Sequence, residues 1–148
     1  MSTIVVAASP STYIASLGAM IDAHGRLGEA YTANPALGDY ARMHTRLRLV
    51  SSVAGGITLS GARRVDPDCS FFELDDVRVI YLPSFRVADP DRIEDDIRGM
   101  EPFHSWLKAH SEAGVLIGAC GASVCHLAVA GLLTDHHVAL HPGLATGF

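Results

Sequence analysis

Residues 114–133, GVLIGACGASVCHLAVAGLL, contain the pattern that decides the fold. The apolar run at 115–117 lies between two glycines and is typical of a strand buried on both faces. From Val124 onward, apolar residues recur at intervals of three and four, which is typical of a helix. The stretch therefore predicts a buried parallel strand that passes directly into a helix, with Cys120 at the junction.

Cys120 stands where a strand-to-helix turn can present a reactive side chain. A nucleophile on such a turn needs small neighbours, because bulky side chains would collide with the bent backbone. Four small residues surround it: Gly118, Ala119, Gly121 and Ala122. The turn would also point the sulfur at the helix N-terminus, whose unpaired N–H groups favour thiolate over thiol. Cys120 is therefore a candidate nucleophile, although a free cysteine is more often a small buried hydrophobic residue.

Length and composition predict one globular domain, 1–148, because 49 % of the 148 residues are apolar and 18 % are charged. The net charge of −5, without a block of like charges, argues against a nucleic-acid-binding surface. Three cysteines, at positions 69, 120 and 125, favour a reduced, cytoplasmic setting over a disulfide framework. The sequence shows no signal-peptide pattern and no apolar run of the roughly 18 residues that a membrane span needs.

Further strands are predicted by apolar or alternating runs. Residues 3–8 and 77–82 have the composition of buried strands, and 138–140 of a last short one. Residues 46–53 alternate between apolar and polar side chains, which predicts a half-exposed strand near a sheet edge. A small hairpin is predicted at 57–65, around Gly61.

Helices are predicted between these strands. The segments are 13–25, a turn or two at 36–43, a short helix at 70–74, then 91–100 and 102–113. The alternation of strand and helix predicts an α/β fold with a mostly parallel sheet covered on both faces. Such sheets bind ligands at the carboxyl ends of their strands, where Cys120 and His141 are both expected.

The sequence resembles a known superfamily over most of its length. Residues 114–142, GVLIGACGASVCHLAVAGLLTDHHVALHP, resemble the core of the ThiJ/PfpI group, within the class I glutamine-amidotransferase-like superfamily. Residues 130–142, AGLLTDHHVALHP, look most like the N-terminal domain of AraC-type transcription regulators. Three upstream segments match in order and spacing: RLRLVSSVAGGITLSGARRVDPDCSFFEL (46–74), VRVIYLP (77–83) and FHSWLKAHSEAG (103–114).

The resemblance implies a flavodoxin-like three-layer sandwich in which Cys120 is the elbow cysteine and His141 its catalytic partner. Gly121, Ser84 and Ser11 would then be the ligand-binding residues around it. The family domain continues with further strand and helix, so a chain that stops at Phe148 is expected to lack the usual C-terminal part.

Three departures from the family pattern favour ligand binding over turnover. The loop at 9–12 holds no acidic residue to polarise the Cys–His pair, and Ser84 and Phe85 stand where glycines are common. The interval from Cys120 to Ala130 is one residue longer than the usual spacing.

A metal site is not predicted, and neither is a cofactor. The spacing C-x4-C-H-x9-H-H-x3-H, from Cys120 to His141, fits no standard ligand pattern. His104 and His110 are predicted at the solvent edge of their helix, and Cys125 in the core.

The leading hypothesis is a ligand-sensing domain of an AraC-type transcription regulator. It would bind a small polar metabolite beside Cys120 and form a homodimer through exposed helices or an edge strand. It would reach DNA only through a helix-turn-helix domain absent from this chain. The alternative is a ThiJ/PfpI-type hydrolase, lyase or hydratase with Cys120 as nucleophile and His141 as base. A redox-sensing or chaperone-like protein is the third hypothesis.

Overall fold

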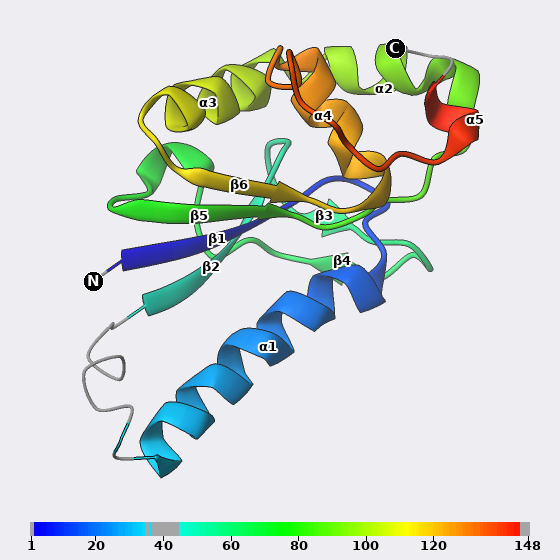
Figure 1. Ribbon diagram of the computed structural model, residues 1–148. Helices are drawn as coiled ribbons and strands as arrows, with labels where there is room; N and C mark the ends of the chain where they lie inside the picture. The colour runs from blue at the N-terminus through cyan, green and yellow to red at the C-terminus, as the bar shows by residue number, and fades with distance from the viewer. Residues whose placement is uncertain (1, 35, 37–44, 146–148) are drawn as a thin grey trace.

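A computed structural model describes residues 2–34, 36 and 45–145 of the chain. Its main sheet has four parallel strands in the order β2-β1-β5-β6 (Figure 1). The strands are β1 (Ser2–Ala8), β2 (Thr45–Ser51), β5 (Val77–Leu82) and β6 (Leu116–Ala119). The predicted parallel α/β sheet is confirmed, and the alternating strand β2 lies at a sheet edge as expected.

Helices cover the two faces of this sheet (Figure 1). One face carries α1 (Ile14–Ala33), and the other carries α2 (Ile93–Arg98), α3 (Glu101–Glu112) and α4 (Val124–Val129). The predicted hairpin is formed by β3 (Ile57–Thr58) and β4 (Arg64–Val65). Short 3-10 turns stand at η2 (Phe71–Glu73), η3 (Pro90–Arg92) and η4 (Gly121–Ser123), and α5 (Pro142–Ala145) follows α4.

The core is divided by the sheet because successive strand side chains point to opposite faces. Val5 and Ala7 of β1 pack with the aromatic residues of α3, whereas Val6 and Ala8 pack with Leu17 of α1. All four strand residues are buried. Burial of one such aliphatic or aromatic side chain stabilises the fold by roughly 1.5–3 kcal/mol, so both helical layers contribute to holding the central strands.

The first helix runs eight residues beyond its predicted end. α1 passes through Gly25 and ends at Ala33, since Gly25 has no positive φ and the following residues include the good helix formers Arg26, Leu27 and Glu29. The helical turn expected at 36–43 lies outside the described residues apart from Ala36. Within the described segments, no helix is both long and apolar enough to cross a membrane.

The prediction of a last strand at 138–140 was wrong. Residues 138–140 form no strand and do not pair with β6. A cavity of about 370 Å³, lined by Ile117 and Ala119 on one side and by His137 and Val138 on the other, separates this segment from β6. Short apolar runs form strands only where a neighbour supplies ladder hydrogen bonds, and here the segment stays irregular.

Candidate functional site

Three loops meet at the carboxyl ends of β1, β5 and β6. The loop after β1 joins the loop after β5 through the isolated bridge between Thr12 and Phe85 and the hydrogen bond from Tyr13 N to Ser84 O, 2.9 Å. The turn after β6 joins the same loop through Ser123 Oγ, which donates to Pro83 O over 2.5 Å. The edge where the sequence predicted a site is therefore one interlocked unit.

The sharp bend after β6 lies at Gly121, not at Cys120 as expected. Gly121 has φ +55°, whereas Cys120 has an ordinary extended backbone with φ −117° and ψ 132°. A Cβ on Gly121 would overlap Ser84 Oγ and lie 3.1 Å from Ser84 Cβ. Only glycine fits this position without strain, both for its φ and for the closeness of Ser84.

This position of the bend accounts for the extra residue in the elbow. Counting the usual family spacing back from Ala130 arrives at Gly121 rather than Cys120. The residue on the strained turn, which would carry the nucleophile in an elbow, therefore has no side chain here.

Cys120 lies on the open face of β6. Along this strand Leu116, Gly118 and Cys120 are exposed, while Ile117 and Ala119 are half-buried beneath the α3 and α4 layer. The Cys120 sulfur makes no capping hydrogen bond to the following turn. Cys120 is accessible, but it lines none of the three cavities described for residues 2–34, 36 and 45–145.

His141 does not stand at the end of a strand, because the strand expected before it is absent. Its ring Nδ1 accepts a hydrogen bond from the N–H of Gly143, 3.1 Å, and the side chain is exposed. No hydrogen bond joins His141 to Cys120 in the part of the chain that the structure describes.

The three predicted ligand-binding residues lie in adjoining loops. Ser11 has φ +65°, and its carbonyl accepts the N–H of Arg86, which follows Ser84 by two residues. Ser84 in turn packs against Gly121. A role for them in binding stays a prediction.

A row of buried hydrogen bonds lies beneath these loops and was not predicted from the sequence. Ser9 Oγ lies 2.9 Å from His126 Nε2, and His126 Nδ1 lies 3.0 Å from His104 Nε2. His126 is 1 % exposed and His104 5 %, so the prediction that His104 faces solvent was wrong. The available signal was the position of His104 on the apolar stripe of α3, next to Phe103 and three residues before Leu107.

Burial keeps both imidazoles neutral. It lowers the pKa of His126 to about 3, with a further lowering by the neighbouring His104. Burial also lowers the pKa of His104, against a smaller opposing effect of Glu101. In one arrangement Ser9 donates to His126, which donates to His104, and the second nitrogen of His104 is left without a partner among the described residues.

The hydrogen bonds from Ser9 to His126 and from His126 to His104 follow the order of a catalytic Ser–His pair with a third group that orients the histidine. The Ser9 hydroxyl is already bonded to His126, however, and Ser9 lines none of the three described cavities, so no described cavity presents it to a substrate. The two hydrogen bonds connect α3 and α4 to the end of β1. Within the described residues, no three His, Cys, Asp or Glu side chains are grouped as metal ligands.

Comparison with known sequences gives no match, either to a protein-family model or to a curated protein. Solved structures do match. Oxidised DJ-1 from Toxoplasma gondii aligns with 100 % of this chain and 71 % of its own, with a TM-score of 0.70 and 19 % identity. A protein from Vibrio parahaemolyticus named as a candidate transcriptional regulator aligns with 91 % and 64 %, at a TM-score of 0.68 and 18 % identity.

A ThiJ/PfpI domain protein from Brachyspira murdochii aligns with 98 % of this chain and 75 % of its own, at a TM-score of 0.57 and 14 % identity. The fold is therefore that of the DJ-1/ThiJ/PfpI structures, as the sequence predicted. The chain spans 61–71 % of the length of the first four matched structures.

Proposed function

We propose that this chain is a ligand-sensing regulatory domain of the kind found in AraC-type transcription regulators, acting in the cytoplasm. The observation that carries the proposal is the glycine at the strained elbow. An elbow enzyme needs a side-chain nucleophile at that position, and Gly121 supplies only backbone, with Ser84 packed against it.

The remaining candidate pairs also favour binding over turnover. Covalent catalysis requires a nucleophile within hydrogen-bond reach of its base. Cys120 has no such bond to His141 among the described residues, and the Ser9–His126 pair is sealed from solvent. A sensing domain requires a concave site and a partner surface, without an activated nucleophile.

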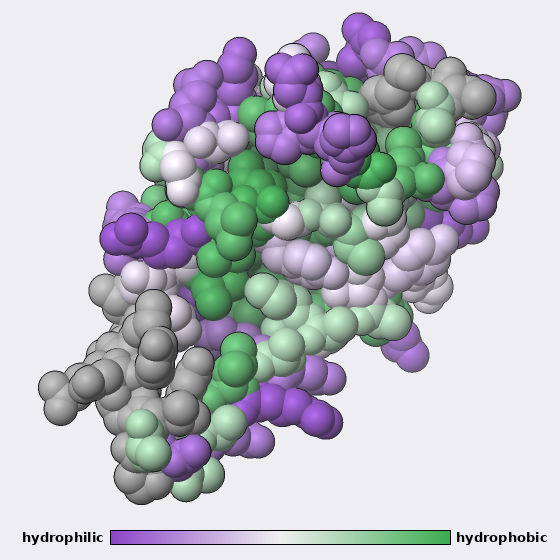
Figure 2. Space-filling model, viewed as in Figure 1, coloured by the Kyte–Doolittle hydropathy of each residue, from purple (hydrophilic) through white to green (hydrophobic). Residues whose placement is uncertain are grey.

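The open edge of β6 supports the proposal of a homodimer. Leu116 is 69 % exposed on this strand, and no strand of the described segments pairs with the outer side of β6. Figure 2 shows hydrophobic surface over the region where β5 and β6 lie. An exposed apolar edge strand invites pairing with a second chain. Contact with DNA would come from a helix-turn-helix domain outside this chain.

A panel of small metabolites screened by thermal shift, with product analysis by NMR, tests the proposal. A sensor is stabilised by at least one compound and returns that compound unchanged. Conversion of the compound that is lost in Cys120→Ser and retained in Leu116→Ala would overturn the proposal in favour of the enzyme. The Leu116 variant is the matched control, because it changes the same exposed face of β6 but keeps the Cys120 thiol.

A further inference from the structure

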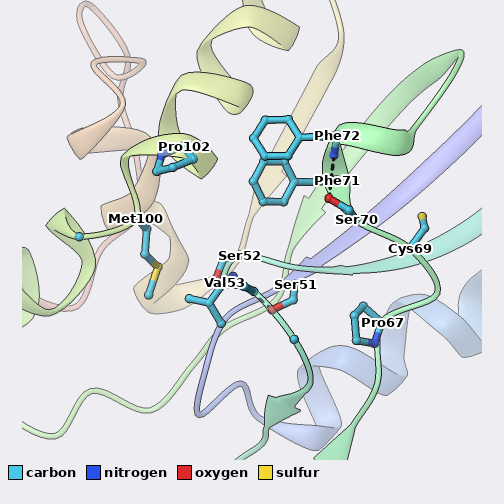
Figure 3. Close-up of a pocket in the computed structure, with 13 residues that line it drawn as sticks. Ser51, Ser52, Val53, Pro67, Cys69, Ser70, Phe71, Phe72, Met100 and Pro102 are labelled. Atoms are coloured by element: carbon cyan, nitrogen blue, oxygen red, sulfur yellow. Dashed lines mark hydrogen bonds between the residues drawn. The ribbon is translucent and has the colours of Figure 1, made fainter.

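The largest described cavity lies away from the elbow, at the carboxyl end of β2. It has a volume of about 450 Å³, within the range of small-molecule sites. Its walls come from three separate segments: residues 51–55 at the end of β2, residues 67 and 69–72 around η2, and residues 99, 100 and 102 where α2 is followed by α3. Figure 3 shows Met100 and Pro102 on one side and residues 51–53 below the two phenylalanines.

The side chains that line this cavity are mostly apolar and carry no charge. The rings of Phe71 and Phe72 meet at the cavity with centroids 4.2 Å apart and a tilt of 40°, and Met100 adds a flexible thioether. None of the thirteen described lining residues carries a charge. Arg48 lies close enough to Cys69 to influence its thiol but does not line the cavity, so a phosphate or dicarboxylate would find no ionic partner in the wall itself.

One polar atom in the wall lacks a partner. Ser52 is 4 % exposed, and its Oγ makes no hydrogen bond among the described residues. A buried hydroxyl without a partner is destabilising, and a ligand that bonds to it would relieve that cost. The Ser52 Oγ is buried in this structure, so a bond to a ligand requires the side chain to take another of its three staggered positions.

Phe72 gives a second, independent indication. Its side chain is 70 % exposed although it stands at the rim of a preformed cavity. An exposed aromatic residue at a concave site is typical of a surface that a ligand covers.

We propose that this cavity binds a small aromatic or alicyclic molecule with one hydrogen-bonding group, held by the two phenylalanines and by Ser52. The inference rests on the proposed sensing function for its biological role, because the bound molecule would be the signal. It moves the signal site from the surroundings of Cys120 to the end of β2.

Titration of the full chain with 2-naphthol, followed by amide NMR, tests the inference. We expect saturable shifts at residues 51–55 and 69–72, and none with succinate, which lacks an apolar body. Ser52→Ala should weaken binding roughly 3- to 10-fold through the lost hydrogen bond. Phe72→Ala should weaken it by about 10-fold, whereas Leu116→Ala, which removes an equally exposed apolar side chain from β6, should not change it.

Three results would overturn the inference: no saturable shift at the cavity, equal binding of succinate, or an affinity unchanged in both Ser52→Ala and Phe72→Ala. These results are separate from the fate of the proposed function. A metabolite that stabilises the chain by binding at 9–12, 84–85 and 120–121, together with no saturable 2-naphthol shift at the cavity, would refute the cavity but keep the sensor. Binding of 2-naphthol at the cavity together with Cys120-dependent turnover of a metabolite would refute the sensor but keep the cavity.

Discussion

The buried His126 makes the stability of the fold sensitive to mild acid. Its folded-state pKa of about 3 lies well below the ordinary value of 6.5, so the folded chain excludes a proton that the unfolded chain binds. Stability is complete above pH 6.5 and falls as the pH drops from 6.5 towards 3. At pH 5 the difference of 1.5 pH units from the ordinary value corresponds to a loss of about 2 kcal/mol from this side chain. His104, whose pKa is also lowered by burial, adds to the loss in the same direction.

Urea denaturation at pH 7 and pH 5 measures this loss. His126→Gln keeps a hydrogen-bonding side chain but does not titrate, so the variant should lose about 2 kcal/mol less than the parent between the two pH values. His137→Gln is the matched control, because it removes an exposed histidine and should keep the parental pH dependence.

The same loss of stability in His126→Gln as in the parent would refute this explanation. An NMR titration of the parent gives a test that needs no variant, since the His126 ring should remain neutral down to about pH 4. A His126 signal that titrates near pH 6.5 would contradict the account of its burial.

Two further predictions concern the elbow and the open edge. Gly121→Ala should destabilise the fold by roughly 1–3 kcal/mol in chemical denaturation, because alanine is strained at φ +55° and its Cβ overlaps Ser84 Oγ. The control variant Gly118→Ala should destabilise it much less, because its Cβ would meet only Tyr81 at 4.0 Å. Equal losses of stability in the two variants would contradict the assignment of the bend to Gly121. Leu116→Lys should shift the chain from dimer to monomer in sedimentation experiments, since a charge on an edge strand opposes pairing; a dimer that persists unchanged would place the interface elsewhere.

The strands that built the sheet could be predicted from local pattern. In β1, β5 and β6 a continuous apolar run suits a strand that is buried on both faces of the sheet. In β2 the alternation of apolar and polar side chains suits a strand at the edge of the sheet. Residues 138–140 show the limit of that argument. Their composition suits a strand, but a strand also needs a paired neighbour, and the neighbour's position is a property of the whole fold.

The meeting of the predicted site residues at one edge of the sheet could be predicted, but the detail of their arrangement could not. The carboxyl edge follows from the order of strands and helices, and Ser84 and Gly121 do meet there. The bond between Ser9 and His126 joins residues 117 positions apart, so no local pattern indicates it. Whether the bend lies at Cys120 or at Gly121 decides whether it carries a side chain. The interval between Cys120 and Ala130 could not decide between these two positions.

The measurement that tests the central claim most directly is the rate at which iodoacetamide alkylates Cys120, followed by peptide mass spectrometry at neutral pH. The account predicts a rate within a few-fold of that of glutathione and no change in His141→Ala, since the bend is at Gly121 and no described histidine forms a hydrogen bond with the thiol. Rapid alkylation of Cys120 that is lost in His141→Ala would contradict it and establish a catalytic pair at the end of β6.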